Sequence, residues 1–163
     1  MSLGNKYDLG TAVPPSDLAA GASTGKRLFM PGLYSVDVVV VKGAGTADED
    51  PVISVQSHAV PTAGTPQNLA VVSEYFTKSE TALDNDEVWV RNTQVASHQI
   101  TATAEEEQVI VFTIRQQDVP SGRPYVSVNV SDAGDDPQVA AVLYVLHPQD
   151  KQASPVNAPA PLR

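Results

Sequence analysis

The residues best suited to chemistry in this 163-residue sequence are carboxylates, which gather in four short acidic clusters. Oxygen ligands at this density can hold Ca²⁺, and a pair of carboxylates in a cleft can hydrolyse a glycosidic bond. None of the clusters has EF-hand spacing, and aromatic residues make up only 6% of the chain, which leaves little to line a sugar cleft. We therefore interpret the clusters as solvated turns and predict no metal site. They are Asp48-Glu49-Asp50, Asp84-Asn85-Asp86-Glu87, Glu105-Glu106-Glu107, and Asp132 with Asp135-Asp136.

The remaining polar residues do not form a recognisable catalytic set. His58, His98 and His147 are each isolated in the sequence, whereas a cupin-type metal site needs two histidines one residue apart and a glutamate. Gly21-Ala22-Ser23-Thr24-Gly25 matches the letters GxSxG, but no apolar strand precedes this stretch, as a nucleophile elbow requires. The absence of cysteine excludes thiol catalysis, thiolate metal sites and disulfides. We predict that the chain is not an enzyme and binds no cofactor.

Two glycine-containing stretches resemble phosphate-binding loops without meeting their requirements. The stretch GASTGK, residues 21–26, has too few residues between its glycines, and Arg27 stands where a P-loop needs a hydroxyl ligand for Mg²⁺. Gly43-Ala44-Gly45 follows an apolar run, but Asp48 occupies the third glycine position of a dinucleotide fingerprint and no helical pattern follows. A hairpin turn explains this second stretch better.

The charge balance narrows the partners that the protein can bind. Asp and Glu number 19 against 10 Lys and Arg, which gives a formal net charge of -9. Such a surface repels phosphate, so we expect no nucleic-acid binding and no docking on an anionic membrane. The longest apolar run, Val38–Val41, is too short to span a bilayer, and residues 1–27 contain no apolar run typical of a secretion signal.

The chain divides into an extended N-terminal arm (residues 1–27), a β-rich body (28–146) and a Pro-rich C-terminal arm (147–163). The first arm lacks a strand or helix period, and Pro14-Pro15 breaks any helix. The prolines of the second arm lower the entropy that is lost when it is laid on a surface. The body contains eight stretches rich in β-branched residues, which are predicted strands. They are residues 33–42, 51–59, 68–76, 87–93, 97–104, 108–115, 125–131 and 139–146.

Eight short strands with hairpin-scale spacing predict an all-β fold, an antiparallel β-sandwich and most naturally a jelly roll. An immunoglobulin-like sandwich is the alternative, although its Cys…Trp…Cys pattern is absent. Strict alternation in residues 125–131 and 51–59 indicates strands with one solvated face, which would include His58.

Three of the predicted strands are apolar on both faces, which is the most informative feature of the body. Residues 38–41, 109–114 and 140–146 lack polar alternation, yet a sandwich strand has only one inner face. The second face must then be covered either by the chain's own loops, or by an arm or a neighbouring subunit. Both alternatives remain open from the sequence.

Trp89, the only tryptophan, alternates with Val88 and Val90. If the two valines face the core, Trp89 and Arg91 lie together on the outer face, and both are residue types enriched at interface hot spots. In the opposite arrangement Trp89 belongs to the core and the valines lie outside.

This layout of an irregular arm, eight Val- and Thr-rich strands and the closing VLYVLHPQDKQASPVNAPAPLR resembles the capsid decoration, or cement, proteins of tailed bacteriophages. The resemblance implies a jelly-roll or related β fold, and trimers in preference to dimers. It also implies that the protein is made in the host bacterial cytoplasm and is located on the outer surface of the virion. The partners implied there are the major capsid protein and copies of the chain itself. A carbohydrate- or receptor-binding module and a minor tail or fibre protein are the alternatives.

We expect partner contacts in both arms and at the tryptophan. The predicted partner-binding residues are Leu3, Tyr7, Leu9, Val13, Trp89, Arg91, Pro148, Pro155, Val156, Pro159 and Leu162.

Overall fold

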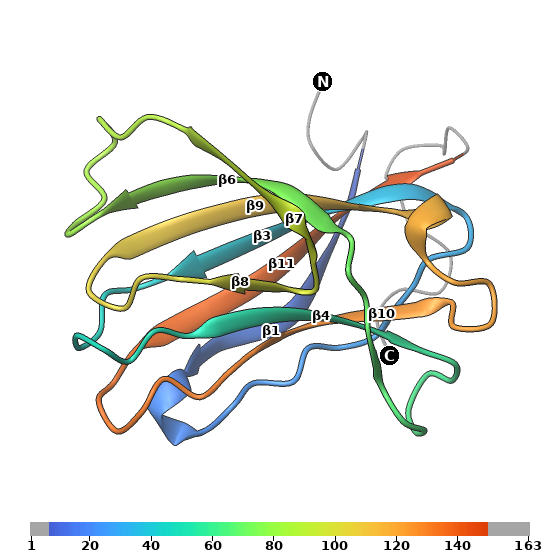
Figure 1. Ribbon diagram of the computed structural model, residues 1–163, viewed down its shortest axis with the longest axis horizontal. Helices are drawn as coiled ribbons and strands as arrows, with labels where there is room; N and C mark the ends of the chain where they lie inside the picture. Colours follow the sequence, from blue (N-terminus) through green and yellow to red (C-terminus); the bar gives the residue numbers. More distant parts are fainter. Residues whose placement is uncertain (1–6, 150–163) are drawn as a thin grey trace.

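The computed structural model describes residues 7–149, which form two antiparallel sheets packed face to face as a β-sandwich (Figure 1). The predicted all-β sandwich is therefore confirmed, while the finer assignment to a jelly roll stays a prediction. The helical part of the described residues is limited to two short 3₁₀ turns, η2 (Leu18–Ala20) and η3 (Gln116–Asp118). No helix in residues 7–149 is long and apolar enough to cross a membrane.

The larger sheet, here called sheet A, has six strands in the order β1-β11-β3-β9-β6-β7. The smaller sheet, sheet B, has the order β2-β10-β4-β5, and β8 also pairs with β4. The strands of sheet A are β1 (Asp8–Asp17), β11 (Val139–Pro148), β3 (Leu33–Lys42), β9 (Glu107–Arg115), β6 (Val72–Glu80) and β7 (Val90–Ser97). Those of sheet B are β2 (Leu28–Phe29), β10 (Tyr125–Val130), β4 (Val52–His58), β5 (Gln67–Asn68) and β8 (Gln99–Thr101).

The N-terminal arm differs from its prediction, because residues 8–17 form β1 at the edge of sheet A. This strand pairs with β11 from Asp8 to Asp17, and its register shifts twice around Val13. The shifts break the two-residue alternation that identifies a strand in sequence, and prolines are tolerated at a bulged edge where no ladder hydrogen bond is needed. The prediction of an arm outside the body is thus corrected for these residues.

The core lies between the sheets, where the inward side chains of β3, β9 and β11 face those of β4 and β10. Tyr144 of β11 is fully buried in this core, and its hydroxyl oxygen accepts a hydrogen bond from the backbone N–H of Val128 in β10 (2.9 Å). Burial raises the pKa of Tyr144, so it stays a neutral phenol. The inward residues that form the centre of the core are Val36, Val38, Val40, Ile53, Val55, Ile110, Phe112, Ile114, Val126, Val128, Val130, Val142, Tyr144 and Leu146.

Gly25 lies against the same stretch of β10, beside the backbone of Val128. A Cβ at Gly25 would lie 2.0 Å from the carbonyl oxygen of Val128, so only glycine allows this close approach. Close to this position, the Lys26 N–H donates to the carbonyl of Ala12. The segment before β2 therefore closes the sandwich beside β1, and Tyr144 satisfies the buried N–H of Val128 from inside.

His58 is buried, although the alternation of β4 predicts a solvated position for it. Its Nε2 lies 2.8 Å from Ser127 Oγ, and Arg27 and Arg123 donate to carbonyls of the loop that follows β4. Burial lowers the pKa of His58 to about 4, with smaller contributions from the charges of Arg27 and Arg123. His58 therefore lies in a buried site beside Ser127 of β10, which the alternation of β4 does not indicate.

We expect Tyr144→Phe to lower the free energy of unfolding by about 1–3 kcal/mol, because it leaves the buried Val128 N–H without an acceptor. Tyr34→Phe is the matched control, since Tyr34 is exposed at the start of β3 and should change stability by less than about 0.5 kcal/mol. Urea denaturation of both variants measures the difference. Equal stability of the two would show that the phenol hydroxyl does not join the sheets.

The lowered pKa of His58 also predicts a pH dependence of stability. The unfolded chain binds a proton near pH 6.5 and the folded chain only near pH 4, so the contribution is present above pH 6.5 and is lost as the pH falls towards 4. The slope from this group is at most about 1.4 kcal/mol per pH unit. His58→Gln should flatten the fall in denaturation midpoint over this range, whereas His98→Gln should leave it unchanged. A fall of the same steepness in His58→Gln would assign it to other groups.

Candidate docking surface

The side of sheet A that faces away from sheet B is mostly apolar. Alternation sends every second residue of β11, β3 and β9 inward to the core, and the residues between them point outward. Most of these outward residues are also aliphatic, and on β1 and β6 the register places Leu9 and Phe76 on the same side. We call this surface the outer face; its apolar members are Leu9, Val39, Val41, Phe76, Val109, Val111, Val139, Ala141, Leu143 and Val145.

Cross-strand register makes the outer face continuous. Leu143 is paired with Val39, Val39 with Val111, and Val111 with Phe76, so one apolar row crosses four strands. Directly paired residues lie side by side on one face of a sheet. The described residues include no element that covers this row, and Leu143 and Phe76 are 40% and 37% exposed. Monomeric soluble proteins rarely leave so extended an apolar surface in water unless it binds something.

The one carboxylate in the middle of the outer face is already satisfied. Asp37 of β3 accepts a hydrogen bond at Oδ1 from the Thr113 hydroxyl (2.6 Å), and its Oδ2 lies 2.8 Å from His147 Nε2. The ring of Tyr7 in turn lies 4.5 Å from that of His147, centroid to centroid. Both carboxylate oxygens of Asp37 therefore keep a hydrogen bond when a partner covers them, which lowers the cost of burying this group.

At the β6–β7 side, three charged side chains have partners within the chain, one ion pair and one cation–π contact. Arg91 donates from Nε to Glu74 Oε2 (2.7 Å), and Lys78 Nζ lies 5.5 Å from the centroid of the Trp89 ring. Arg91 is also paired with Phe76 across the strands. The outer face thus has an apolar centre and a polar rim, the usual anatomy of a protein–protein interface.

A shallow groove of about 220 Å³ follows the outer face where β6 and β9 approach η3. Phe76 and Val111 line its apolar part, and Glu74, Arg115 and Asp118 stand at its border. A groove of this size accepts one or two small aliphatic side chains, since it is smaller than a typical ligand pocket.

The structure places the predicted partner-binding residues unequally. Leu9 is on the outer face and 55% exposed. Trp89 and Arg91 are exposed at the rim of this face. Tyr7 contacts the ring of His147, which lies on the outer face. Val13 is buried in the core and is not available to a partner, which corrects its assignment to a free arm. Pro148 ends β11 and pairs with β3. Leu3, Pro155, Val156, Pro159 and Leu162 lie outside the described residues.

The alternation around Trp89 is also partly corrected. Trp89 is 51% exposed, as the outward arrangement requires, but Val88 and Val90 are exposed as well rather than buried. Val90 is the first residue of β7, the edge strand of sheet A. The strands that sheet B offers near this edge, β5 and β8, are too short to cover it.

The residues that sequence reasoning missed are the central outward valines, Phe76 and Leu143. The signal was present, because residues 38–41, 109–114 and 140–146 are apolar on both faces. It identifies strands with two apolar faces, but only the register shows that Val39, Val111 and Leu143 form one row.

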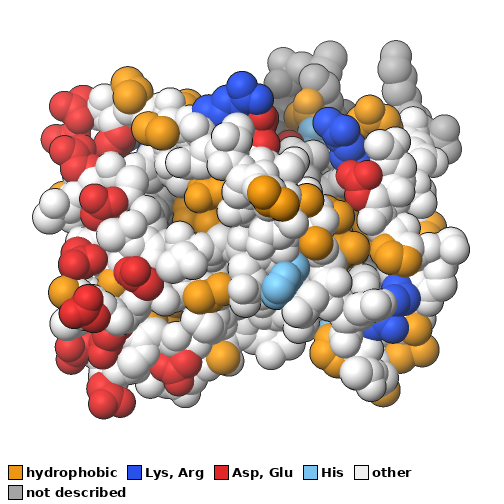
Figure 2. Space-filling model, viewed as in Figure 1, with side chains coloured by type: hydrophobic (Ala, Val, Ile, Leu, Met, Phe, Trp, Pro, Cys, Tyr) orange, Lys and Arg blue, Asp and Glu red, His pale blue; other side chains and the backbone are white. Residues whose placement is uncertain are grey.

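All four acidic clusters gather at one end of the sandwich, in the loops β3–β4, β6–β7, β8–β9 and β10–β11 (Figure 2, left). Lys42 is the buried cation beneath them, and its Nζ donates to the carbonyls of Thr103 (2.7 Å), Ala104 (3.2 Å) and Glu106. Burial lowers the pKa of Lys42, and the carboxylates, Glu106 first, oppose that shift. This acidic end disfavours any association that brings two copies together there.

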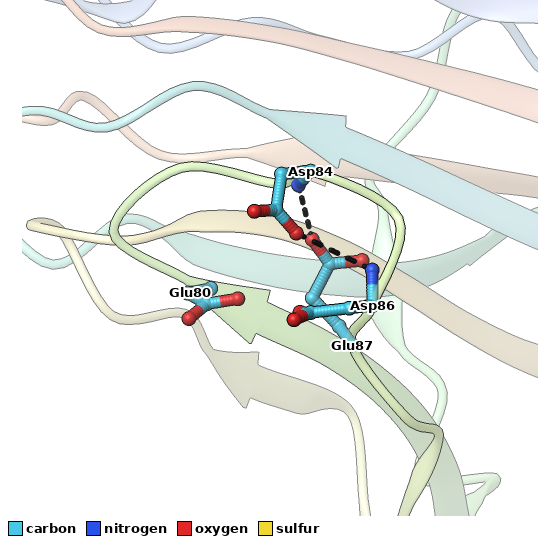
Figure 3. Close-up of side chains that lie close together, drawn as sticks. All are labelled: Glu80, Asp84, Asp86 and Glu87. Carbon is cyan, nitrogen blue, oxygen red and sulfur yellow. Dashed lines mark hydrogen bonds between the residues drawn. The ribbon is translucent and has the colours of Figure 1, made fainter.

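Four carboxylates of this end lie especially close together: Glu80, Asp84, Asp86 and Glu87 (Figure 3). Their oxygens lie within 4.8 Å of one another, and Glu87 Oε1 accepts from the backbone N–H groups of Asp84 and Asn85. Repulsion from Asp86, with burial and the other acidic neighbours, raises the pKa of Glu80. Three of the four are exposed, and Glu87 serves the turn itself, which agrees with solvated turn residues.

Comparison with protein-family models, curated proteins and solved structures gave no match to this chain.

Two leucines of one strand test whether the outer face is separate from the core. Leu146 of β11 points inward and is 2% exposed, whereas Leu143 points outward. We expect Leu146→Ala to lower the free energy of unfolding by about 2–5 kcal/mol, and Leu143→Ala by less than about 1 kcal/mol. Denaturant titration of both at a protein concentration low enough to prevent association measures the difference. Equal losses would mean that the outer face is needed for folding.

Proposed function

We propose that this chain is a structural protein of a bacteriophage virion that binds the outside of an assembled capsid and stabilises it. Its partners in this proposal are the major capsid protein and copies of itself, in trimers rather than dimers. The observation that carries the proposal is the outer face, an apolar surface whose central carboxylate, Asp37, is hydrogen-bonded through both oxygens. Such a surface suits broad, permanent contact with other subunits, because its apolar centre can lose water at little polar cost.

The arrangement of the ends fits attachment to a shell. Asp8 of β1 is paired with Leu146 of β11, so the two ends of the described chain lie together. They lie at the opposite end of sheet A from the acidic loops (Figures 1 and 2). Segments that leave the body there can reach neighbouring subunits without bringing two acidic ends together, and several weak contacts on one rigid body reinforce one another.

The polar groups of the described residues favour a structural role over catalysis. His58 and Ser127 form a hydrogen-bonded pair, but both are buried, so no substrate reaches them. His98 is hydrogen-bonded to Asn68 (3.0 Å) and His147 to Asp37. Each histidine is therefore hydrogen-bonded to another side chain of the fold. A general base instead needs an accessible position beside its substrate.

One observation favours the alternative of a carbohydrate- or receptor-binding module. The outward side of sheet B carries a shallow groove of about 250 Å³, whose lining includes the amides of Gln56, Gln99 and Asn129. Amides and hydroxyls suit sugar hydroxyls, but Asn129 and Gln56 already bond to each other (3.0 Å). The groove lining contains no aromatic ring on which a sugar could stack. We therefore rank this alternative second.

Purified virions of the phage that carries this sequence test the proposal. We expect the protein on the capsid in many copies per particle, and recombinant chain should rebind particles from which it has been removed. Val111→Glu should weaken this rebinding at least about tenfold, because it places a charge in the apolar row. Val60→Glu is the matched control, since Val60 is exposed in the loop after β4, away from the outer face.

Three results would contradict the proposal. The protein could be missing from the particles, Val111→Glu could rebind as well as Val60→Glu, or antibody labelling could place the protein on the tail. The last result would identify the minor tail or fibre protein of the sequence analysis. Thermal stabilisation of a monomer by a simple sugar would instead identify the binding module.

A further inference from the structure

We infer that the outer face of sheet A binds residues 150–163 of a neighbouring copy of this chain. This inference rests on the proposed function only in assuming that copies assemble. It assigns an occupant to a surface that the described residues leave open.

The direction of β11 at its end favours a neighbouring copy over the same chain. Pro148 is still paired with Leu33, the first residue of β3, and the N–H of Gln149 donates to the carbonyl of Gly32 (3.0 Å). The chain therefore still follows the direction of β11, past the first residue of β3, at the last described residue. A tight reversal onto its own outer face typically uses Gly, Asn or Asp, and residues 149–154 contain only Asp150 of these types and no glycine.

The composition of residues 150–163 matches an apolar surface. The segment contains Pro155, Val156, Pro159, Pro161 and Leu162 together with three alanines. Proline has no N–H to desolvate, and a polyproline-like chain loses little entropy on binding. Extended proline-rich segments bind shallow grooves that contain aromatic side chains, and the outer face offers Phe76 in its groove and Trp89 at its rim.

The reach and the charge of the segment also fit. Fourteen residues at about 3.1 Å each extend about 43 Å, and six strands about 4.8 Å apart span about 24 Å. The segment can therefore cross the whole of sheet A. It carries Lys151 and Arg163 against Asp150, a charge opposite in sign to that of the whole chain. Asp118 borders the groove where a basic side chain would lie.

Complementation between two full-length variants tests the inference. The face variant is Val111→Glu, and the segment variant combines Val156→Glu with Leu162→Glu. Wild type should be an oligomer in sedimentation velocity, and each variant alone should be a monomer. An equimolar mixture should form a one-to-one dimer, because the intact segment of the face variant can bind the intact outer face of the segment variant.

The controls separate folding from binding. Leu143→Glu is a second face variant at a more exposed position of the same row, and each variant should keep a thermal midpoint close to that of wild type. A labelled peptide of residues 150–163 should bind the segment variant. It should bind a chain that also carries Val111→Glu at least tenfold more weakly, as judged by anisotropy and by the fluorescence of Trp89.

Any of three results would overturn the inference. They are a monomeric wild type, a segment variant that assembles like wild type, and a mixture of the two variants that stays monomeric. The experiment contains no capsid, so its outcome is independent of whether the protein is found on virions. Absence from virions with successful complementation would refute the proposed function and leave this inference intact.

Discussion

The constraint on which the rest depends is that a sandwich strand has two faces and a sandwich covers only one. The inward side chains of β3, β9 and β11 are closed off by sheet B, and Tyr144 links the two sheets through the backbone of Val128. Most outward side chains in the middle of the same strands are aliphatic as well, but no described element covers them. Apolar area in water is unfavourable in proportion to its extent, so leaving this second face uncovered costs free energy that a partner would remove.

Electrostatics determines how that face can be used. Carboxylates are concentrated at one end of the sandwich, where Lys42 is the buried counter-charge, and the two ends of the described chain lie at the other (Figures 1 and 2). On the outer face itself, both carboxylate oxygens of Asp37 are hydrogen-bonded, one to Thr113 and one to His147. Like charge therefore keeps acidic ends apart while the outer face can lose its water, which restricts the orientations in which copies can associate.

The sequence predicts the fold well where local pattern and final environment agree, as in β3, whose predicted range is the observed one. It fails where the environment is set by distant residues. The register shifts around Val13 interrupt the alternation of β1, and the edge position of β7 leaves Val90 exposed. His58 is buried beside Ser127 of β10. For the docking surface, the doubly apolar strands are visible in the sequence. The row through Val111 is not, because register depends on pairing between strands far apart in the chain.

The two outward surfaces of the sandwich form a comparison within one molecule. On sheet B, the outward positions of β4 and β10 hold polar residues such as Ser54, Gln56 and Asn129, and the last two bond to each other. On sheet A, most of the equivalent positions hold valine, alanine or leucine. Both surfaces belong to strands with the same β-forming requirements, and threonine would satisfy strand propensity as well as valine does. Folding alone therefore gives no reason for the difference, whereas a permanent partner on sheet A does.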